Sequence, residues 1–421
     1  MRIAIIGGGY VGLVTGACFA KFGHIINIVE IDAKKAATIN AGESPIHEQG
    51  LDALLERHAG ERLSAGTDYS PVAEADLSFI CVGTPPAADG SADLSMVAAA
   101  GRSIGEALRD GECTHTVVVK STVPPGTTAG LVVPMVLECS GRDDIGFAMN
   151  PEFLREGRAV EDFLYPDRIV IGSRDDRSGD MVAAVYRGLS APMVRCGLTP
   201  AEMIKYASNA LLATKISFAN EVGNVCKCLG IDVYEVMEGV GMDHRVSAHF
   251  LSAGVGFGGS CFPKDVAALV SLAESLGEEP SLLQSVLDVN DRQPLRMVRL
   301  LEERIGNLLG KRVAVLGLAF KDNTDDIRES RAIPVIAELL RRGAVVAAYD
   351  PLAVAPMRRI FPEIDYAASA ADALRDADAC LVMTEWPEFS DLDGEFDRMK
   401  SRVIIEGRRI LSCEGKEGIC W

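Results

Sequence analysis

A glycine-rich turn near the start of the chain constrains the fold more than any other feature. The apolar run from Ile3 to Ile6 has the character of a buried strand, and Gly7-Gly8-Gly9-Tyr10-Val11-Gly12 follows it directly, before a helical stretch that ends near Phe22. In this strand–turn–helix context the pattern predicts a dinucleotide-binding α/β unit, because the glycines allow a tight turn and let the backbone approach a pyrophosphate. We expect the cofactor to be bound by Gly7, Gly9, Tyr10, Val11 and Gly12.

The second strand predicts which dinucleotide binds. It runs from Ile25 to Val29 and ends at Glu30, whose carboxylate can accept hydrogen bonds from both ribose hydroxyls. A carboxylate at this position favours NAD over NADP, since it would repel a 2′-phosphate. Asp32 is an alternative for the ribose, and Lys34 or Lys35 could contact phosphate.

Composition narrows the class of protein. The 421 residues are enough for two or three domains, and a net charge of −18 argues against nucleic acid or an anionic membrane as the main partner. The 11 cysteines show no paired zinc-ligand spacing, so we expect reduced thiols and no metal site. No run approaches the length of about 20 apolar residues that a membrane span needs. These features predict a soluble protein of the cytoplasm.

Polar loops follow three further strand-like runs, which we place at Leu77 to Val82, Thr116 to Lys120 and Phe147 to Met149. The loops begin with Gly83-Thr84, Ser121-Thr122 and Asn150-Pro151-Glu152. Because ligands collect at the carboxyl ends of parallel strands, all three loops are candidates for contact with cofactor or substrate. Read without other context, such loops are more often simple turns and helix caps.

The middle of the chain is predicted to be helical. One long helix should run from Pro200 to Gly230, with further helical segments to about Ile305. Lys205 and Asn209 lie four residues apart and therefore share a face of the long helix.

A second glycine-rich turn, Gly256 to Asp265, carries Cys261 to the start of a helix in which Pro263 suits the first position. The helix N-terminus and Lys264 would favour the thiolate form of Cys261, which makes it a candidate nucleophile. The alternative is a small buried hydrophobic residue with no chemical role.

The last part of the chain begins a second α/β unit at Lys311. Its first strand, Val313 to Leu316, is followed by Gly317 to Lys321, which lacks the full glycine fingerprint, so no second dinucleotide site is predicted. Strand-like runs recur at Val345 to Tyr349 and at Cys380 to Met383. The predicted fold is two Rossmann-like parallel-sheet domains joined by a mostly helical region, with domains at residues 1–199, 200–305 and 306–421.

Three motifs carry a resemblance to a known family. Residues 256–265, GFGGSCFPKD, resemble the active-site signature of the UDP-glucose/GDP-mannose dehydrogenase family, and residues 120–127 and 150–157 resemble its KSTVPPGT and NPEFLREG motifs. The resemblance runs through the whole chain and is strongest to the UDP-glucose branch. It implies a homodimer that oxidises the C6 alcohol of UDP-glucose to the acid with two NAD⁺, through a cysteine thiohemiacetal and thioester.

The resemblance also implies residue roles. Lys205 and Asn209 would stabilise oxyanions, Asp265 would order a water in the first oxidation, and Glu152 would activate water for thioester hydrolysis. The implied catalytic set is Cys261, Lys205, Asn209, Asp265, Glu152 and Thr122. The implied cofactor contacts, besides the first glycine turn, are Glu30, Lys35, Gly83, Thr84, Thr122, Glu156 and Arg328. The implied substrate contacts are Glu152, Phe153, Leu154, Lys205, Asn209, Phe257, Gly258, Phe320, Lys321, Arg408 and, from the partner chain, Arg245.

Two departures from the branch leave GDP-mannose as an alternative substrate. Arg331 stands where many bacterial relatives have proline, and the ending Gly418 to Trp421 resembles GDP-mannose 6-dehydrogenases. Two other classes also stay open: a two-electron hydroxyacid dehydrogenase and a non-catalytic NAD-responsive binding module. The hydroxyacid dehydrogenase would need no cysteine and no third α/β domain, and the binding module would have no use for Cys261, Lys205 and Asp265 together.

Overall fold

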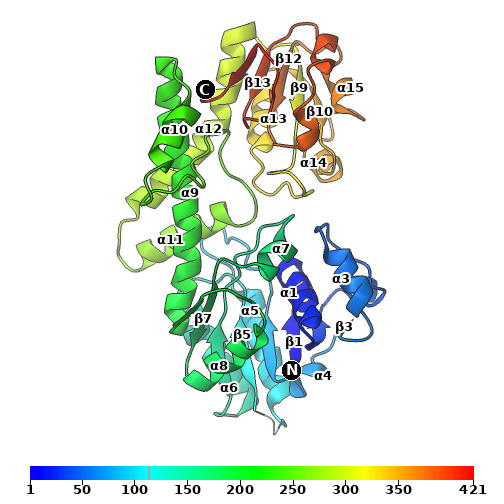
Figure 1. The fold of residues 1–421 in the computed structure, drawn as a ribbon, viewed down its shortest axis with the longest axis vertical. Helices are drawn as coiled ribbons and strands as arrows, with labels where there is room; N and C mark the ends of the chain where they lie inside the picture. Colours follow the sequence, from blue (N-terminus) through cyan, green and yellow to red (C-terminus); the bar gives the residue numbers. More distant parts are fainter. Residues whose placement is uncertain (112–113) are drawn as a thin grey trace. The chain divides into compact units, whose positions relative to one another are not determined.

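The computed structural model describes residues 1–111 and 114–421. The chain forms two compact units, Met1–Ser208 and Asn209–Trp421, each with its own β-sheet (Figure 1). The ten described cysteines are free thiols, and Cys113, which we also expected to be reduced, lies outside the described residues.

The first unit is a doubly wound α/β structure. Its described residues form a sheet of eight strands in the order β3-β2-β1-β4-β5-β6-β7-β8, and only the β6–β7 pair is antiparallel. This order reverses direction between β1 and β4, as in dinucleotide-binding folds. The strands are β1 (Arg2–Ile6), β2 (Ile25–Val29), β3 (Leu63–Gly66), β4 (Leu77–Ile80), β5 (Thr116–Val119), β6 (Gly146–Met149), β7 (Ile169–Ser173) and β8 (Met193–Cys196).

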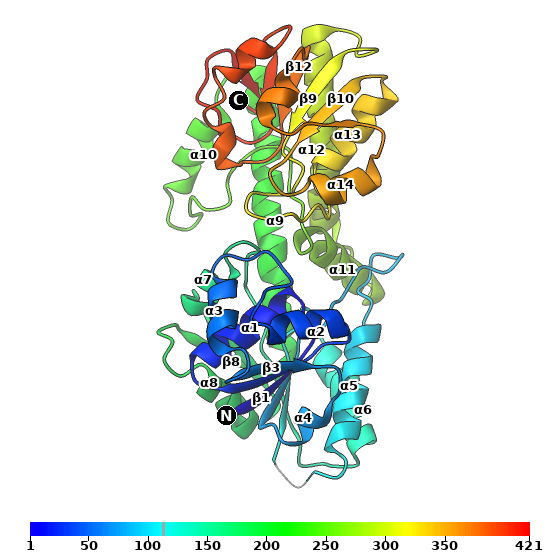
Figure 2. The same ribbon diagram turned by 90° about the vertical axis from the view of Figure 1, so that its right-hand side faces the viewer.

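Alternation along the strands gives this sheet a core on each face. Ile3 and Ile5 of β1 pack in one cluster with α1 and α3, whereas Ala4 and Ile6 pack in another with α5 and α6. Figure 2 shows α5 and α6 side by side. The helices are α1 (Tyr10–Lys21), α2 (Ala33–Asn40), α3 (Leu51–His58), α4 (Ser70–Ala73), α5 (Ser95–Leu108), α6 (Val133–Ser140), α7 (Ala159–Leu164) and α8 (Asp176–Val185), with a π-helical turn at Thr128–Val132 ahead of α6.

The second unit combines helices with a fully parallel sheet of six strands among the residues described. The strand order, β11-β10-β9-β12-β13-β14, repeats the doubly wound pattern. The strands are β9 (Arg312–Leu316), β10 (Val345–Tyr349), β11 (Asp365–Tyr366), β12 (Ala379–Val382), β13 (Ile404–Glu406) and β14 (Lys416–Gly418). The helices are α9 (Leu198–Leu229), which begins in the first unit, α10 (Val233–Gly241), α11 (Phe262–Ser275), α12 (Ser281–Ile305), α13 (Ala332–Arg341), α14 (Val354–Ile360) and α15 (Ala370–Leu374).

The predicted fold class and the long helix are confirmed, with small shifts at element ends. α8 begins at Asp176, where the Asp175 side chain caps it. Pro263 occupies the second rather than the first position of α11, because Phe262 is already helical. The division into three domains remains a prediction.

Candidate functional site

The first glycine turn has the geometry that its sequence predicts. Gly7 has a φ of +104°, and a Cβ at this position would lie 2.7 Å from the Cys81 carbonyl oxygen. A Cβ on Gly12 would lie 1.9 Å from the Gly7 carbonyl oxygen, whereas a Cβ on Gly9 would meet no protein atom within 4 Å. The protein itself therefore requires glycine at positions 7 and 12. At Gly9 the space is open, as expected where a pyrophosphate approaches the backbone at the start of α1.

The two acidic candidates for the ribose have different surroundings. The Glu30 carboxylate is buried and accepts hydrogen bonds from the Gly8 N–H at 3.0 Å and from the Asp32 N–H at 2.9 Å. The Asp32 side chain instead caps α2 by accepting from the N–H groups of Lys34 and Lys35. Both carboxylates accept from two backbone N–H groups, so these bonds do not distinguish them; Glu30 directly follows β2, and the Lys35 side chain is exposed on the first turn of α2.

The loops after β4 and β5 are joined at the predicted nicotinamide end. These strands are parallel neighbours, so both loops leave the same edge of the sheet. The Thr84 hydroxyl donates to the Thr122 carbonyl oxygen at 2.9 Å. Thr84 is buried, while Thr122 and Gly83 retain exposure. The structure therefore brings together three of the predicted cofactor residues.

Glu152, in the loop after β6, forms a buried ion pair with Lys205 of α9. The Glu152 Oε1 to Lys205 Nζ distance is 3.0 Å, and the Leu154 N–H donates to Glu152 Oε2 at 2.5 Å. Burial raises the pKa of the Glu152 carboxyl, but the Lys205 ammonium and the Leu154 N–H lower it by more, so the pKa lies below its usual value. Glu152 is therefore an anion, suited to hold or activate water. The Lys205 ammonium also lies 5.2 Å from the centre of the Phe153 ring.

In the second unit, the glycines around Cys261 are required by close packing. A Cβ on Gly258 would lie 2.2 Å from the Glu329 carbonyl oxygen, and a Cβ on Gly259, whose φ is +82°, would lie 2.7 Å from the Phe320 ring. The turn thus packs directly on Phe320, a predicted nucleotide-sugar contact. This packing delivers Cys261 to the N-cap position of α11, half-buried, with its Sγ 3.6 Å from the Ser260 hydroxyl.

The backbone of Phe257 is fixed by one buried side chain from α12. Asn290 accepts from the Phe257 N–H at 2.7 Å and donates to the Phe257 carbonyl at 3.0 Å. Arg408 also reaches this turn, since its Nη2 donates to the Gly256 carbonyl at 2.5 Å while its Nε pairs with Glu385 at 3.1 Å. The predicted substrate residues Phe257, Gly258, Phe320 and Arg408 therefore lie around a single turn.

A second cluster joins Asn209 to the first turn of α11. The Asn209 amide donates to Asp265 Oδ2 at 2.6 Å, and the Lys264 ammonium contacts Asp265 Oδ1 at 2.6 Å. Asp265 is 1% exposed, and its N–H donates to the Cys261 carbonyl at 2.9 Å. The predicted nucleophile and two predicted polar partners are thus held together by direct hydrogen bonds.

Two arginines that we predicted as ligand contacts each form an ion pair with an aspartate two residues earlier in the chain. Arg245 pairs with Asp243 in the loop after α10, and its side chain is 79% exposed. Arg328 pairs with Asp326, and its side chain is 62% exposed. Both guanidinium groups therefore stay largely exposed to solvent beside their carboxylate partners. Lys321 lies next to the Phe320 ring, with its ammonium 5.6 Å from the ring centre.

The sheet of the second unit differs from the first at the position that would bind a ribose. Asp350 follows β10, but one of its oxygens accepts from the N–H groups of Leu318 and Ala319 and from the Trp386 indole at 3.0 Å. Its other oxygen accepts from Leu352 and Ala353 at the following turn. The Asp350 carboxylate therefore binds the backbone N–H groups of the turn after β9. This agrees with the incomplete glycine fingerprint of that turn.

Sequence reasoning did not single out several buried polar groups. Glu202 of α9 accepts from the N–H groups of Gly126 and Thr128 and from the Thr128 hydroxyl, all within 2.7 Å. Burial raises the pKa of the Glu202 carboxyl, against the effect of these hydrogen bonds. Lys120 donates to Asn150 Oδ1 at 3.0 Å, between β5 and β6. Glu202 could have been found, because it lies three residues before Lys205 on the same helical face.

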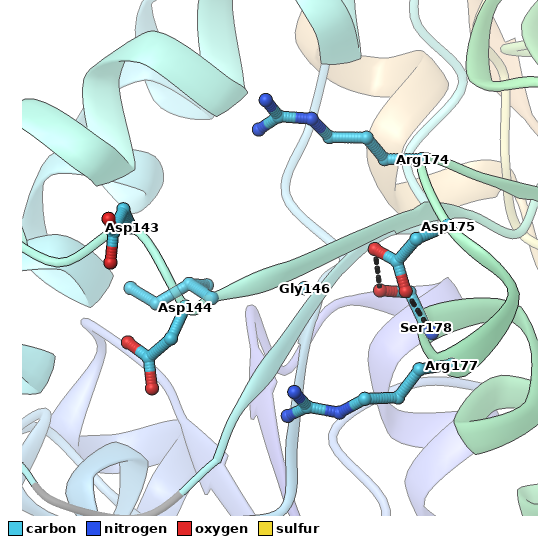
Figure 3. Close-up of a pocket in the computed structure, with 8 residues that line it drawn as sticks. Asp143, Asp144, Gly146, Arg174, Asp175, Arg177 and Ser178 are labelled. Carbon is cyan, nitrogen blue, oxygen red and sulfur yellow. Dashed lines mark hydrogen bonds between the residues drawn. The ribbon is translucent and has the colours of Figure 1, made fainter.

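A polar hollow in the first unit lies apart from these residues (Figure 3). Its volume is about 250 Å³, and it contains the cap of α8, where Asp175 accepts from the Ser178 N–H and hydroxyl. None of the predicted site residues lines it, so it is not part of the candidate site. Its lining residues are Asp143, Asp144, Ile145, Gly146, Arg174, Asp175, Arg177 and Ser178.

Within residues 1–111 and 114–421, no helix combines the length and the apolar character needed to cross a membrane. The same residues contain no group of three or more His, Cys, Asp or Glu side chains placed to hold a metal ion.

Comparison with known families and proteins gives matches along nearly the entire chain. Three models of the UDP-glucose/GDP-mannose dehydrogenase family match: the NAD binding domain at residues 1–190, the central domain at 199–292 and the UDP binding domain at 314–413. The UDP-glucose 6-dehydrogenase AglM of Haloferax volcanii is 53% identical over 420 residues, which cover 98% of this chain and 97% of that protein.

Solved structures agree with these matches. A UDP-glucose dehydrogenase from Pyrobaculum islandicum superposes with a TM-score of 0.95 at 45% identity, covering 100% of this chain and 98% of the other. A GDP-mannose dehydrogenase from Pseudomonas aeruginosa gives a TM-score of 0.58 at 36% identity, covering 100% of both chains.

Proposed function

The chain belongs to the UDP-glucose/GDP-mannose dehydrogenase family, and from this premise we propose that it oxidises the C6 alcohol of UDP-glucose to the carboxylate of UDP-glucuronate. It carries the NAD-binding domain of the family, and bound NAD⁺ would supply the hydride acceptor for each of two successive oxidations. The observation that carries the activity is Cys261 at the N-cap of α11, next to the buried Asn209–Asp265 pair. The 53% identity to a UDP-glucose 6-dehydrogenase supports the substrate.

The proposal gives each polar residue a chemical task. In the first oxidation Asp265 takes up the alcohol proton through a water, and in the second the Cys261 thiolate adds to the aldehyde carbon to form a thiohemiacetal. Lys205 and the Asn209 amide donate to the oxygen that becomes negative. Oxidation of the thiohemiacetal gives a thioester, which water attacks with Glu152 as the base, releasing the Cys261 thiolate and the carboxylate. The depressed pKa of Glu152 supports this last role, because the carboxylate is ionised at neutral pH.

Further proposed contacts complete the site. For the cofactor these are Glu30 at the ribose, Lys35 and Arg328 at phosphate, and Gly83, Thr84, Thr122 and Glu156 toward the nicotinamide. For the UDP-sugar, the packing of Phe257, Gly258, Phe320 and Arg408 around one turn supports a shared binding surface, to which the proposal adds Lys321, Phe153 and Leu154.

We also propose that the active form is a homodimer and that Arg245 reaches the partner's substrate. Four apolar side chains on α9 are 52% to 68% exposed, and three of them recur every seven residues, so they share a face that a second copy could cover: Leu211, Phe218, Val225 and Leu229. Light scattering should give twice the chain mass, and Phe218→Asp should lower it. A cytoplasmic location stays a prediction from sequence.

A panel of sugar nucleotides tests the substrate. Purified protein with NAD⁺ should produce NADH with UDP-glucose and little with GDP-mannose. The 45% identity to the solved UDP-glucose dehydrogenase, against 36% to the GDP-mannose dehydrogenase, supports this order. NADH formation with GDP-mannose and none with UDP-glucose would contradict the substrate while leaving the chemistry intact.

A further inference from the structure

Glu48 is a buried carboxylate that the proposed reaction does not use. It lies in the loop between α2 and α3 and is 3% exposed. A buried carboxylate is costly unless it is paired or hydrogen-bonded, so its partners indicate what it does.

The partners of Glu48 come from two distant parts of the first unit. The Tyr10 hydroxyl, from the first glycine turn, donates to Glu48 Oε2. The Gly157 N–H donates to the same oxygen at 2.7 Å, and the Ala159 N–H donates to Glu48 Oε1 at 2.8 Å. Gly157 N–H also lies 2.8 Å from the Tyr10 hydroxyl oxygen. One carboxylate therefore connects the cofactor turn with the segment that leads from Glu152 into α7.

The hydrogen bonds of Glu48 are of a kind that holds the cofactor turn and the segment before α7 rigidly together. Burial and the neighbouring Glu48 raise the pKa of Tyr10 far above its usual value, so its hydroxyl keeps the proton that it donates. Ala159 is the first residue of α7, where N–H groups have no partner within the helix, and Gly157 lies just before the N-cap residue Arg158. Each hydrogen bond to a charged group is stronger than a neutral one.

We propose that Glu48 is a positioning residue for sugar oxidation. It fixes the position of segment 152–159 relative to the cofactor turn. The inference rests on the proposed function, in which Glu152, Phe153 and Leu154 contact the reacting sugar. Lys205 and the Leu154 N–H fix Glu152 at one end of the segment, and Gly157 and Ala159 form the other end. Glu48 holds that end.

The test compares Glu48→Gln with Ser44→Ala in the full-length protein. Glutamine keeps the size of the side chain, but its NH₂ group faces a backbone N–H donor, so one of the two segment bonds is lost. Ser44→Ala removes a hydroxyl that donates to the Ile46 carbonyl within the same loop and makes no bond to residues 155–159. It is the matched control for a general disturbance of the loop.

We expect Glu48→Gln to increase the rate of amide exchange at Gly157 or Ala159 by about tenfold, which is the effect of losing one hydrogen bond to a charged group. The KM for UDP-glucose should rise by about the same factor. The dissociation constant for NADH should change less, because the glutamine oxygen can still accept from Tyr10. In a double-mutant cycle, adding Tyr10→Phe to Glu48→Gln should raise the KM by less than Tyr10→Phe does alone, because Tyr10 then loses a bond to a neutral amide and not to a carboxylate.

Three results would overturn the inference: wild-type exchange and KM in Glu48→Gln, an equal effect of Ser44→Ala, or additive effects of the two substitutions. Failure of the proposed function would look different. A wild-type protein that forms no NADH from UDP-glucose contradicts that function, whereas amide exchange at Gly157 and Ala159 still decides whether Glu48 holds the segment.

Discussion

Replacing Lys205 with methionine tests the buried ion pair of the candidate site. Methionine keeps most of the length and apolar volume of lysine but removes the ammonium that lies 3.0 Å from Glu152. The Glu152 side chain is 6% exposed, so water cannot replace the lost partner without a structural change. The carboxylate keeps the Leu154 N–H and the weaker attraction of Lys120.

Lys205→Met should lower the free energy of unfolding by a large amount at neutral pH. Removing one partner of a buried ion pair destabilises a protein by about 3–5 kcal/mol, because a buried charge is left uncompensated. For a unit the size of Met1–Ser208, ~1 kcal/mol shifts Tm by about 2–4 °C. Lys205→Met should therefore lower the Tm of the first unit by roughly 6–20 °C at pH 7.

The loss of stability in Lys205→Met should become smaller as the pH falls. In the wild type the depressed pKa of Glu152 gives stability above the unfolded value of about 4.5, which is lost as the pH falls through the folded pKa. Without Lys205, burial dominates and raises the pKa of Glu152, so the variant loses stability as the pH rises above about 4.5. The difference between the two proteins should shrink from pH 7.5 to about pH 5.5.

Urea unfolding at both pH values measures this difference. Lys205→Met with Glu152→Gln is the control, because it replaces the pair with neutral groups of similar size and should recover most of the lost stability. The reasoning fails if the deficit is the same at both pH values, or if the double variant is as unstable as Lys205→Met.

Three further substitutions probe the glycine turns. Gly9→Ala should leave Tm unchanged and weaken NADH binding in a fluorescence titration, whereas Gly12→Ala should lower both, because its Cβ would lie 1.9 Å from the Gly7 carbonyl oxygen; equal Tm values for the two variants would contradict this difference. Asn290→Ala should cost about 2–5 kcal/mol in urea unfolding and lower turnover, since it leaves the buried N–H and carbonyl of Phe257 without a partner; an unchanged unfolding curve would show that water replaces both bonds.

The sequence predicted the central strands because they are buried on both faces and read as continuous apolar runs. β2 and β10 have the predicted limits. The strands at the sheet edges, β3, β8, β11 and β14, were not predicted. β8 has mostly exposed residues, and β14 reads Lys-Glu-Gly, so neither has the apolar run or alternation that marks a strand in sequence. Only pairing with a neighbouring strand defines them.

Site residues were predictable where local sequence carries the chemistry. Cys261 follows a glycine-rich turn and precedes a helix, and both features are visible in ten residues. Glu48 and Glu202 act through hydrogen bonds to backbone groups that are 74 or more residues away along the chain, apart from the bond between Glu48 and Tyr10. No local pattern encodes such contacts, so these residues became visible only in the folded chain.

The stoichiometry of NADH tests the central claim most directly. The first unit has one glycine fingerprint for a dinucleotide, and in the second unit Asp350 binds the backbone of the corresponding turn. Cys261 can hold the half-oxidised sugar while one cofactor molecule is exchanged for the next. With limiting UDP-glucose and an aldehyde trap, absorbance at the NADH band should reach two NADH per sugar nucleotide, with UDP-glucuronate as product and no trapped aldehyde. One NADH per sugar nucleotide, together with trapped aldehyde, would contradict the account.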